Sequence, residues 1–136
     1  MRRISVSCRP NLGARAQETD FRFHEINGES YWDESAYYAF SLQEIENDLE
    51  APSGELAALC LEATGRIVTD EQQLKRLAIP EHAWDLILQC WRRKDPSLYG
   101  RFDLAYGGAG PAKLLEYNAD TPTALFEASV FQWIWL

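Results

Sequence analysis

The sequence of 136 residues has few cysteines and no long apolar run. No segment approaches the roughly 20 consecutive apolar residues that a membrane-spanning helix needs. The chain starts with MRRISVSCRP, which lacks the apolar centre of a signal peptide, so we expect a cytoplasmic protein that does not bind membranes. Cys8, Cys60 and Cys90 are far apart and form no CxxC pair, which disfavours a zinc site.

Positive charge is also scarce. Thirteen lysines and arginines stand against 21 acidic residues, which gives a formal net charge of -8. This charge repels phosphate backbones, so nucleic-acid binding is disfavoured. The chain contains no internal repeat, and its length and its 46% hydrophobic content suit one domain over residues 1–136.

Helical patterns occupy much of the chain. We expect helices at 11–20, 69–77, 81–93 and from about Pro122 to Leu136. Another begins at Ser41, where SLQE forms a capping box with Glu44. Pro52 and Gly54 interrupt it, which predicts a kinked helix or two abutting helices. Two apolar stripes are predicted to be core: Leu42, Ile45, Leu49, Leu56, Leu59, Ala63 and Ile67, and then Trp84, Ile87, Leu88 and Trp91.

Two segments predict β-hairpins, so the expected class is α+β, with helices packed against a hairpin sheet. Asn27-Gly28 is a two-residue turn signal after the alternation of Phe21, Phe23 and Ile26. The second hairpin joins 101–106 to 113–118 across a glycine-rich loop.

Polar residues gather on one face of this second hairpin. Strand alternation places Arg101 beside Asp103, and Glu116 beside Asn118. If Tyr106 pairs with Lys113, Asp103 lies opposite Glu116 and Arg101 opposite Asn118, although a bulge would change this register. Two carboxylates and an amide oxygen suit Mg²⁺, and Arg101 could hold a phosphate bound by the same metal. The alternative is a cross-strand salt bridge on a solvated face.

The residues after this hairpin are candidates for substrate binding. Asp120, Thr121 and Thr123 surround the expected start of the last helix, with Thr121 as its N-cap and Pro122 at its first position. The positive end of that helix would lie near the acidic face and could meet an anionic ligand, whereas ordinary capping is the alternative.

Several strings together resemble a known family. They are LYGRFD at 98–103, KLLEYNADTPT at 113–123, EA at 127–128, FQW at 131–133, FRFH at 21–24, YWDE at 31–34 and YYAFS at 37–41. Over nearly the whole chain the sequence resembles the amino-terminal, pre-ATP-grasp-like portion of glutathionylspermidine synthases, which are ATP-grasp ligases.

The resemblance implies an ATP-dependent carbon–nitrogen ligase. In that family ATP phosphorylates the glycine carboxylate of glutathione, and an amine of spermidine then displaces phosphate, with Mg²⁺ required. Asp103, Glu116 and Asn118 match the family's metal ligands, and Arg101 matches the arginine that steadies the transferring phosphoryl group. The expected partners are therefore the small molecules ATP, a glutathione-like peptide and a polyamine.

The carboxy-terminal end raises a question about completeness. Family members continue into an ATP-grasp portion, whereas this sequence stops within FQWIWL and contains no GxxxxGK[ST] phosphate loop. We therefore expect a piece truncated at its carboxy terminus, inactive without the missing ATP-grasp portion. The alternative is a non-catalytic helical binding module that docks a partner through its apolar carboxy-terminal helix.

Overall fold

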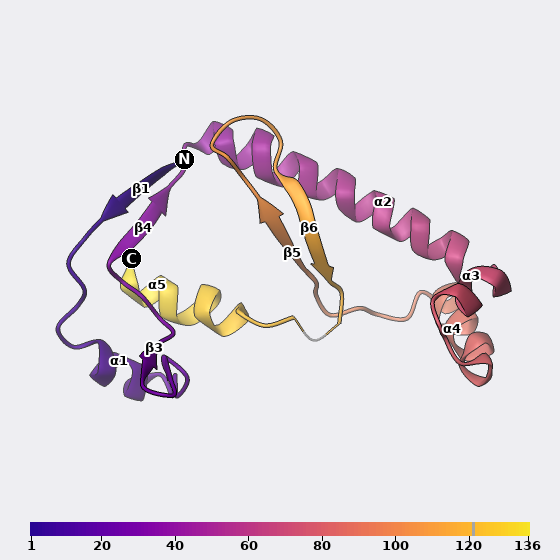
Figure 1. The fold of residues 1–136 in the computed structure, drawn as a ribbon, viewed down its shortest axis with the longest axis horizontal. Coiled ribbons are helices and arrows are strands. Elements are labelled where there is room, and N and C mark those ends of the chain that lie inside the picture. The colour runs from indigo at the N-terminus through magenta and orange to yellow at the C-terminus, as the bar shows by residue number, and fades with distance from the viewer. Residues whose placement is uncertain (121) are drawn as a thin grey trace.

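The computed structural model describes residues 1–120 and 122–136 and has the α+β class that the sequence predicts. Its strands pair into two-stranded antiparallel sheets, β1 with β4, β2 with β3 and β5 with β6 (Figure 1). The elements in chain order are β1 (Arg2–Ser5), α1 (Leu12–Glu18), β2 (Glu25–Ile26), β3 (Glu29–Ser30), β4 (Ala36–Ala39), the π-helical segment η1 (Glu44–Glu50), α2 (Ala51–Ile67), α3 (Glu71–Arg76), α4 (Glu81–Arg93), β5 (Arg101–Ala105), β6 (Lys113–Asn118), the π-helical segment η2 (Glu127–Phe131) and α5 (Gln132–Trp135).

Local sequence signals locate several elements correctly. The β2–β3 turn has positive φ at both Asn27 and Gly28, at 54° and 81°, as a two-residue hairpin turn of this kind requires. The carboxylate of Asp70, the residue before α3, accepts hydrogen bonds from the backbone N–H groups of Gln72 and Gln73. The pair β1–β4 was not expected, because its strands are short and 31 to 37 residues separate the partners, which pair from Arg2 with Ala39 to Ser5 with Ala36.

The helical segment that follows Ser41 changes from π-helical to α-helical hydrogen bonding close to Pro52. Ser41 and Glu44 form the expected capping box, with Ser41 N–H donating to Glu44 at 2.7 Å and Glu44 N–H donating to Ser41 Oγ at 3.2 Å. η1 then passes directly into α2 beside Pro52, so of the two expected arrangements the structure has two abutting helical segments, the first π-helical and the second α-helical. Pro52 has no N–H to donate to the Asp48 carbonyl, which accepts instead from Ala112 N–H at 2.8 Å. The β5–β6 loop is thereby fixed to this helix.

The last helical stretch begins later than predicted. Helical backbone starts at Leu125 rather than at Pro122 and continues through η2 and α5. Ala124 has a φ of 72°, in the left-handed region, so a right-handed helix cannot run through it. The expected N-cap, Thr121, lies outside the described residues.

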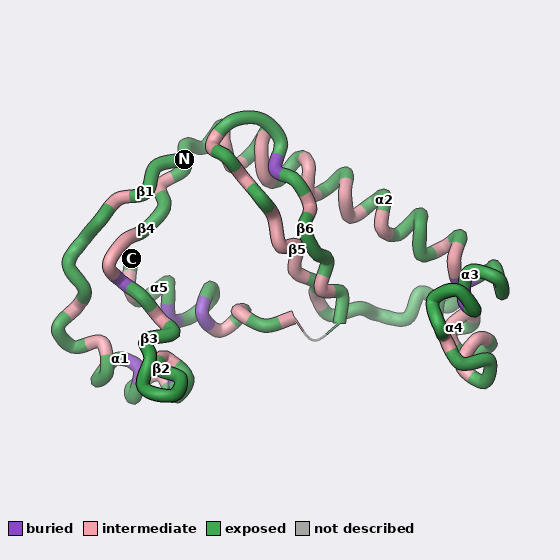
Figure 2. The backbone as a smooth tube through the Cα atoms, in the orientation of Figure 1, coloured by how far each residue is buried: buried purple, intermediate pink, exposed green. Residues whose placement is uncertain are grey.

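The core lies where residues 12–32 pack against the last helical stretch. Ala16, Phe21 and Phe131 are its buried members, and Leu12, Trp32 and Phe126 pack against them. Figure 2 shows how few residues of the tube are buried.

The two apolar stripes predicted to be core are not buried. Within the described chain α2 and α4 bury no residue, and Leu42 and Leu59 are 71% and 61% exposed. Figure 1 shows the reason, since α2 extends from beside the amino terminus to α3 and α4 with little chain along its length. None of the helices in the described residues is long and apolar enough to cross a membrane.

Candidate functional site

The register of the β5–β6 hairpin brings the four predicted site residues together. Arg101 lies opposite Asn118, and Asp103 lies opposite Glu116, as strand alternation predicts. On the other face Phe102 packs against Tyr117, with ring centroids 4.4 Å apart. The polar side chains therefore share the face that this aromatic pair leaves free.

The pairing near the loop differs by one residue from the prediction. Lys113 pairs with Ala105 rather than with Tyr106, because the register shifts between Asp103 and Leu104. Leu115 is the extra residue of this bulge, without a partner across the hairpin. The bulge lies between the loop and the four polar residues, so their juxtaposition is preserved.

Hydrogen bonds join these four side chains, which we call the hairpin cluster. Arg101 Nε donates to Asp103 Oδ1 at 2.7 Å, and its Nη2 donates to Asp103 Oδ2 at 3.1 Å. In the amide orientation that gives both atoms a partner, Asn118 donates to Glu116 at 3.1 Å and accepts from Arg101 at 3.2 Å. The cluster is thus one connected polar network.

The ion pair of the cluster lies along one strand rather than across two, which differs from the cross-strand alternative that the sequence allowed. Its side chains are partly exposed, 33% for Arg101 and 38% for Asp103. The hydrogen bond from Arg101, more than its charge, holds the pKa of Asp103 below the usual range, and the same bond raises the pKa of Arg101. Asp103 is therefore an ionised ligand candidate at neutral pH.

The loop after β6 holds the other side of the Arg101 guanidinium. Arg101 Nη1 donates to the Thr123 carbonyl at 3.0 Å and to its hydroxyl at 2.8 Å. Of the predicted substrate-binding residues, Thr123 thus joins the cluster, Asp120 is exposed, and Thr121 lies outside the described residues.

The cluster has the donor chemistry of a site for a hard cation. Its carboxylates and its amide supply oxygen atoms, which Mg²⁺ prefers. A carboxylate has about four lone-pair sites, so Asp103 can accept from Arg101 and still offer an oxygen to a metal. In the described residues no group of three Asp, Glu, His or Cys side chains could hold a metal ion. The Asn118 oxygen is therefore needed if the protein is to supply three metal ligands.

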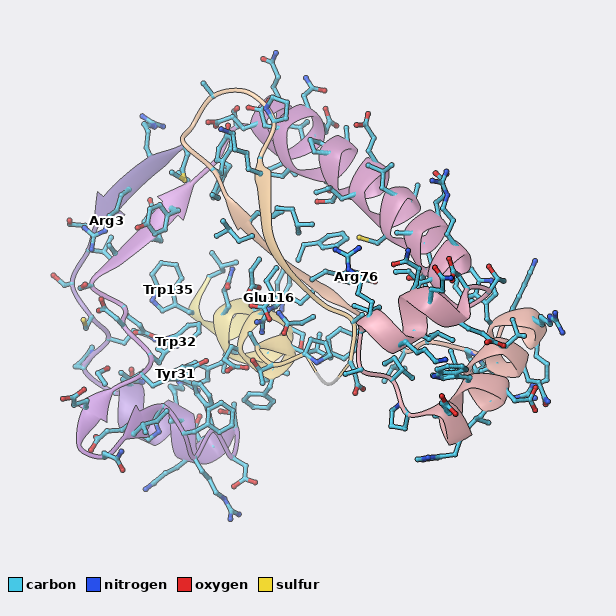
Figure 3. The ribbon with its side chains drawn as sticks, turned by 45° about the vertical axis from the view of Figure 1, so that its right-hand side comes forward. Arg3, Tyr31, Trp32, Arg76, Glu116 and Trp135 are labelled. Carbon is cyan, nitrogen blue, oxygen red and sulfur yellow. The ribbon has the colours of Figure 1, made fainter. Side chains whose placement is uncertain are left out.

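A hollow of about 700 Å³ lies beside the hairpin cluster, and we call it the Tyr31 pocket. Phe23, Ile26 and Tyr31 line it from the β2–β3 region, and Tyr99 lines it from the segment before β5. The remaining lining comes from 122–124, which precede the last helix, and from its first residues, 125–127 and Ser129. Thr123 lines this pocket and also accepts a hydrogen bond from Arg101. In Figure 3 Tyr31 lies beside the last helix, with Glu116 on the neighbouring hairpin.

Sequence reasoning did not find the polar contact inside this pocket. Tyr31 Oη donates to Glu127 Oε1 at 2.8 Å, and 96 positions separate the two residues. Glu127 is buried, with 8% of its surface exposed. The hydrogen bond to Glu127 raises the pKa of Tyr31, with burial adding to it, and the positive charge of Arg101 opposes it.

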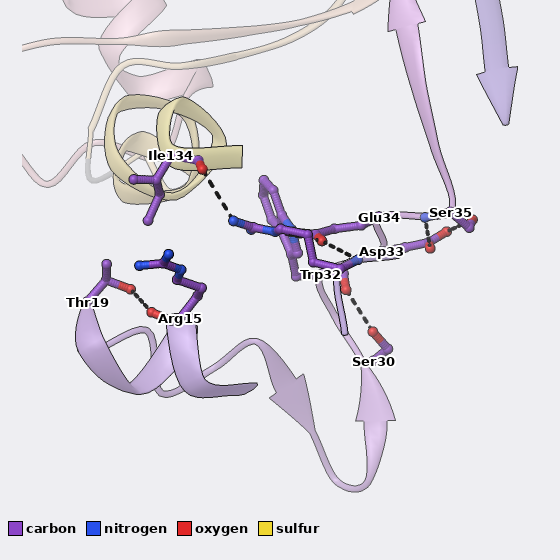
Figure 4. A network of polar contacts seen from close by, with 9 residues as sticks. Arg15, Thr19, Ser30, Trp32, Asp33, Glu34, Ser35 and Ile134 are labelled. Atoms are coloured by element: carbon purple, nitrogen blue, oxygen red, sulfur yellow. Dashed lines mark hydrogen bonds and ion pairs between the residues drawn. The ribbon is translucent and has the colours of Figure 1, made fainter. Parts of the chain in front are cut away.

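A second unpredicted network fixes the last helix against the amino-terminal region (Figure 4). Arg9 Nε donates to both carboxylate oxygens of Glu34, at 3.1 and 2.9 Å, and Trp32 Nε1 donates to Glu34 at 3.0 Å. Arg9 also donates to the Ile134 carbonyl at 3.3 Å. Burial alone would raise the pKa of Glu34, but hydrogen bonds from Arg9 and Trp32 outweigh it and hold that pKa below the usual range.

The fold and the hairpin cluster define an α+β domain with a polar site on a two-stranded hairpin. The family model described as "Glutathionylspermidine synthase preATP-grasp" matches residues 3–136. The chain belongs to this family.

Curated relatives carry ligase or synthetase names. A "Putative acid--amine ligase" of Haemophilus influenzae is 35% identical over 140 residues, which cover 100% of this chain and 35% of that protein. "Trypanothione synthetase" of Crithidia fasciculata is 34% identical over 76 residues, covering 55% of this chain and 12% of that protein. "Bifunctional glutathionylspermidine synthetase/amidase" of Escherichia coli is 28% identical over 112 residues, covering 82% and 18%. The chain thus spans about a third or less of the length of these relatives.

Proposed function

We propose that this chain is the amino-terminal part of an ATP- and Mg²⁺-dependent carbon–nitrogen ligase. Its substrates would be the carboxylate of glutathione or a similar peptide and a polyamine such as spermidine. One observation carries the proposal, namely the convergence of Arg101, Asp103, Glu116 and Asn118 on one hairpin face. The ligase and synthetase names of the relatives support it, and their greater length supports an ATP-grasp portion outside this chain.

The residues of the cluster have separate tasks in this proposal. Asp103, Glu116 and Asn118 would hold Mg²⁺, which when bound neutralises phosphate charge. Asp103, Asn118 and Thr123 accept from all five N–H groups of Arg101, so Arg101 would bind the transferring phosphoryl group by exchanging one of these contacts for a phosphate oxygen. Because these neighbours already hold the guanidinium beside the two carboxylates, the exchange needs little movement of the Arg101 side chain, which suits phosphoryl transfer.

The proposed reaction has two steps. A carboxylate oxygen of the peptide attacks the γ-phosphorus of ATP, which releases ADP and leaves an acyl phosphate. The neutral amine nitrogen then attacks the carbonyl carbon, inorganic phosphate leaves, and the nitrogen loses a proton. The chain contributes position and charge to the first step rather than a covalent bond.

The test is Mg²⁺-dependent ADP release with glutathione, with and without spermidine, by the protein that the natural reading frame containing this chain encodes. Removal of groups that merely support a metal ligand costs about 10–100-fold, so Asp103→Asn is expected to lower turnover at least about tenfold and to require more Mg²⁺. Glu55→Gln removes the same charge from an exposed position of α2 and should change neither value. An unchanged Mg²⁺ dependence in Asp103→Asn would contradict the proposal.

A second candidate is a non-catalytic module that docks a partner through its last helix. The observation that favours it is the exposure of Trp133 and Leu136, at 75% and 81%. If the chain is such a module, the protein releases no ADP under any of these conditions. It binds a partner instead, and Trp133→Ala weakens that binding whereas Asp103→Asn does not.

A further inference from the structure

We propose that the Tyr31 pocket binds a primary ammonium group carried on an alkyl chain, with the Glu127 carboxylate as its counter-charge. This inference rests on the proposed function, because it gives a place to the ammonium group of one of the two substrates. It goes beyond the hairpin cluster, since Glu127 and Tyr31 belong to other elements.

The first observation is a buried acid with an incomplete set of partners. Burying a carboxylate costs free energy unless a cation or several hydrogen-bond donors compensate it. Glu127 is 8% exposed and lines the pocket, and among the described residues it forms no ion pair. Its hydrogen-bond donor there is the neutral hydroxyl of Tyr31, at 2.8 Å. A ligand with an ammonium group supplies the missing charge.

The second observation is the aromatic wall. The rings of Phe23 and Tyr31 lie 6.1 Å apart between centroids, and those of Phe23 and Phe126 lie 6.5 Å apart. All three residues line the pocket together with Tyr99. Aromatic faces attract cations and cover methylene groups, so the wall suits both the charge and the chain of an alkyl amine. An anionic ligand would gain from neither the rings nor Glu127.

The third observation is the position of the pocket. Thr123 lines it and also binds Arg101, whose charge acts on the Tyr31 hydroxyl. A ligand held at Glu127 therefore extends toward the side of the hairpin where the acyl phosphate would form. This arrangement places an amine-bearing molecule next to the proposed reaction centre.

Two substrates of the proposed reaction carry an ammonium group. A polyamine has ammonium groups and no carboxylate, whereas a γ-glutamyl peptide has an ammonium group next to a carboxylate. The experiment therefore uses spermidine and glutathione as separate probes, with 1-butylamine and 1-butanol as a charged and neutral pair of similar size.

The test is an NMR titration of the 136-residue chain with each probe, without ATP or Mg²⁺. We expect saturable binding of 1-butylamine and of at least one substrate probe, with shifts at Tyr31 and Phe126. Glu127→Gln, which keeps the shape of the side chain, should weaken the amine at least tenfold. It should leave 1-butanol binding unchanged, which verifies that the pocket is intact. Glu55→Gln removes the same charge elsewhere and should have no effect.

The outcomes separate the possibilities. Spermidine binding that depends on Glu127 assigns the pocket to the polyamine, and glutathione binding with that dependence assigns it to the peptide. Equal effects of Glu127→Gln and Glu55→Gln, or shifts outside the pocket, overturn the inference, because attraction to the net negative chain would then explain the binding. If the Tyr31 pocket does not bind amines, Asp103→Asn should still lower ADP release. If Asp103→Asn does not change ADP release, amine binding at Glu127 should still be observed.

Discussion

Glu34→Gln is expected to destabilise the chain strongly, because Glu34 neutralises Arg9 where the amino-terminal region packs against the last helix. The Glu34 side chain is 1% exposed and that of Arg9 is 20% exposed. Arg9 also donates to the Ile134 carbonyl, and its guanidinium lies 5.5 Å from the centre of the Phe131 ring. The amide can still accept a hydrogen bond, but it leaves the positive charge of Arg9 without compensation.

The magnitude follows from the burial of the pair. Breaking a buried ion pair by removing one partner costs about 3–5 kcal/mol, and the partial exposure of Arg9 points to about 3 kcal/mol. This equals roughly a 150-fold change in the unfolding equilibrium constant, at about 1.4 kcal/mol for each factor of ten. With the usual unfolding entropy per residue, the melting temperature of a chain of this length should fall by about 10 °C.

Urea unfolding followed by tryptophan fluorescence measures this loss, as a lower midpoint with an unchanged slope. Glu62→Gln is the matched control, since Glu62 pairs with Arg66 on an exposed helix face and should give no measurable change. If Glu34→Gln shifts the midpoint no more than Glu62→Gln does, the buried pair does not stabilise the junction.

Three further predictions concern the same fold. Because the folded pKa of Glu34 is lowered, its contribution to stability is present above the unfolded pKa of about 4.3 and is lost as the pH falls through the folded value. The stability gap between wild type and Glu34→Gln, measured by urea titration, should therefore shrink below about pH 4. Phe131→Ala should cost about 3–5 kcal/mol in the same assay, since Phe131 is fully buried, and a loss below 1 kcal/mol would contradict its place in the core. Gly100→Ala should cost roughly 1–3 kcal/mol, because its Cβ would lie 2.6 Å from the Tyr117 ring, whereas Gly107→Ala meets nothing within 4 Å and should be neutral.

The site geometry was predictable from sequence to the extent that it depends on strand alternation. The two-residue period places Arg101 with Asp103 and Glu116 with Asn118, whatever the rest of the fold does. The bulge at Leu115 was not predictable, because no glycine or proline marks it and its effect is confined to the loop side of the cluster. The register prediction succeeded for the four polar residues despite the wrong pairing of Lys113.

Contacts between distant segments were beyond sequence reasoning. The Arg9–Glu34 pair depends on how the segments next to β1 and β4 come together, and the Tyr31–Glu127 pair depends on how the last helix packs against the amino-terminal region. The sequence spacing of these residues does not identify their partners. The apolar stripe of the second helical segment did predict a helix, but periodicity shows which face is apolar and not whether other chain covers it. For this reason Leu42 was predicted to be core and is exposed.

The central claim, that the hairpin cluster is the cation site, is tested most directly with Mn²⁺ in place of Mg²⁺. Mn²⁺ broadens NMR signals close to where it binds, so even weak binding to this chain in the presence of ATP can be located. We predict selective broadening at Asp103, Glu116 and the Asn118 side-chain amide, and its loss in Asp103→Asn. Equal broadening at the acidic residues Glu44 and Asp48, or broadening that Asp103→Asn leaves unchanged, would contradict the account.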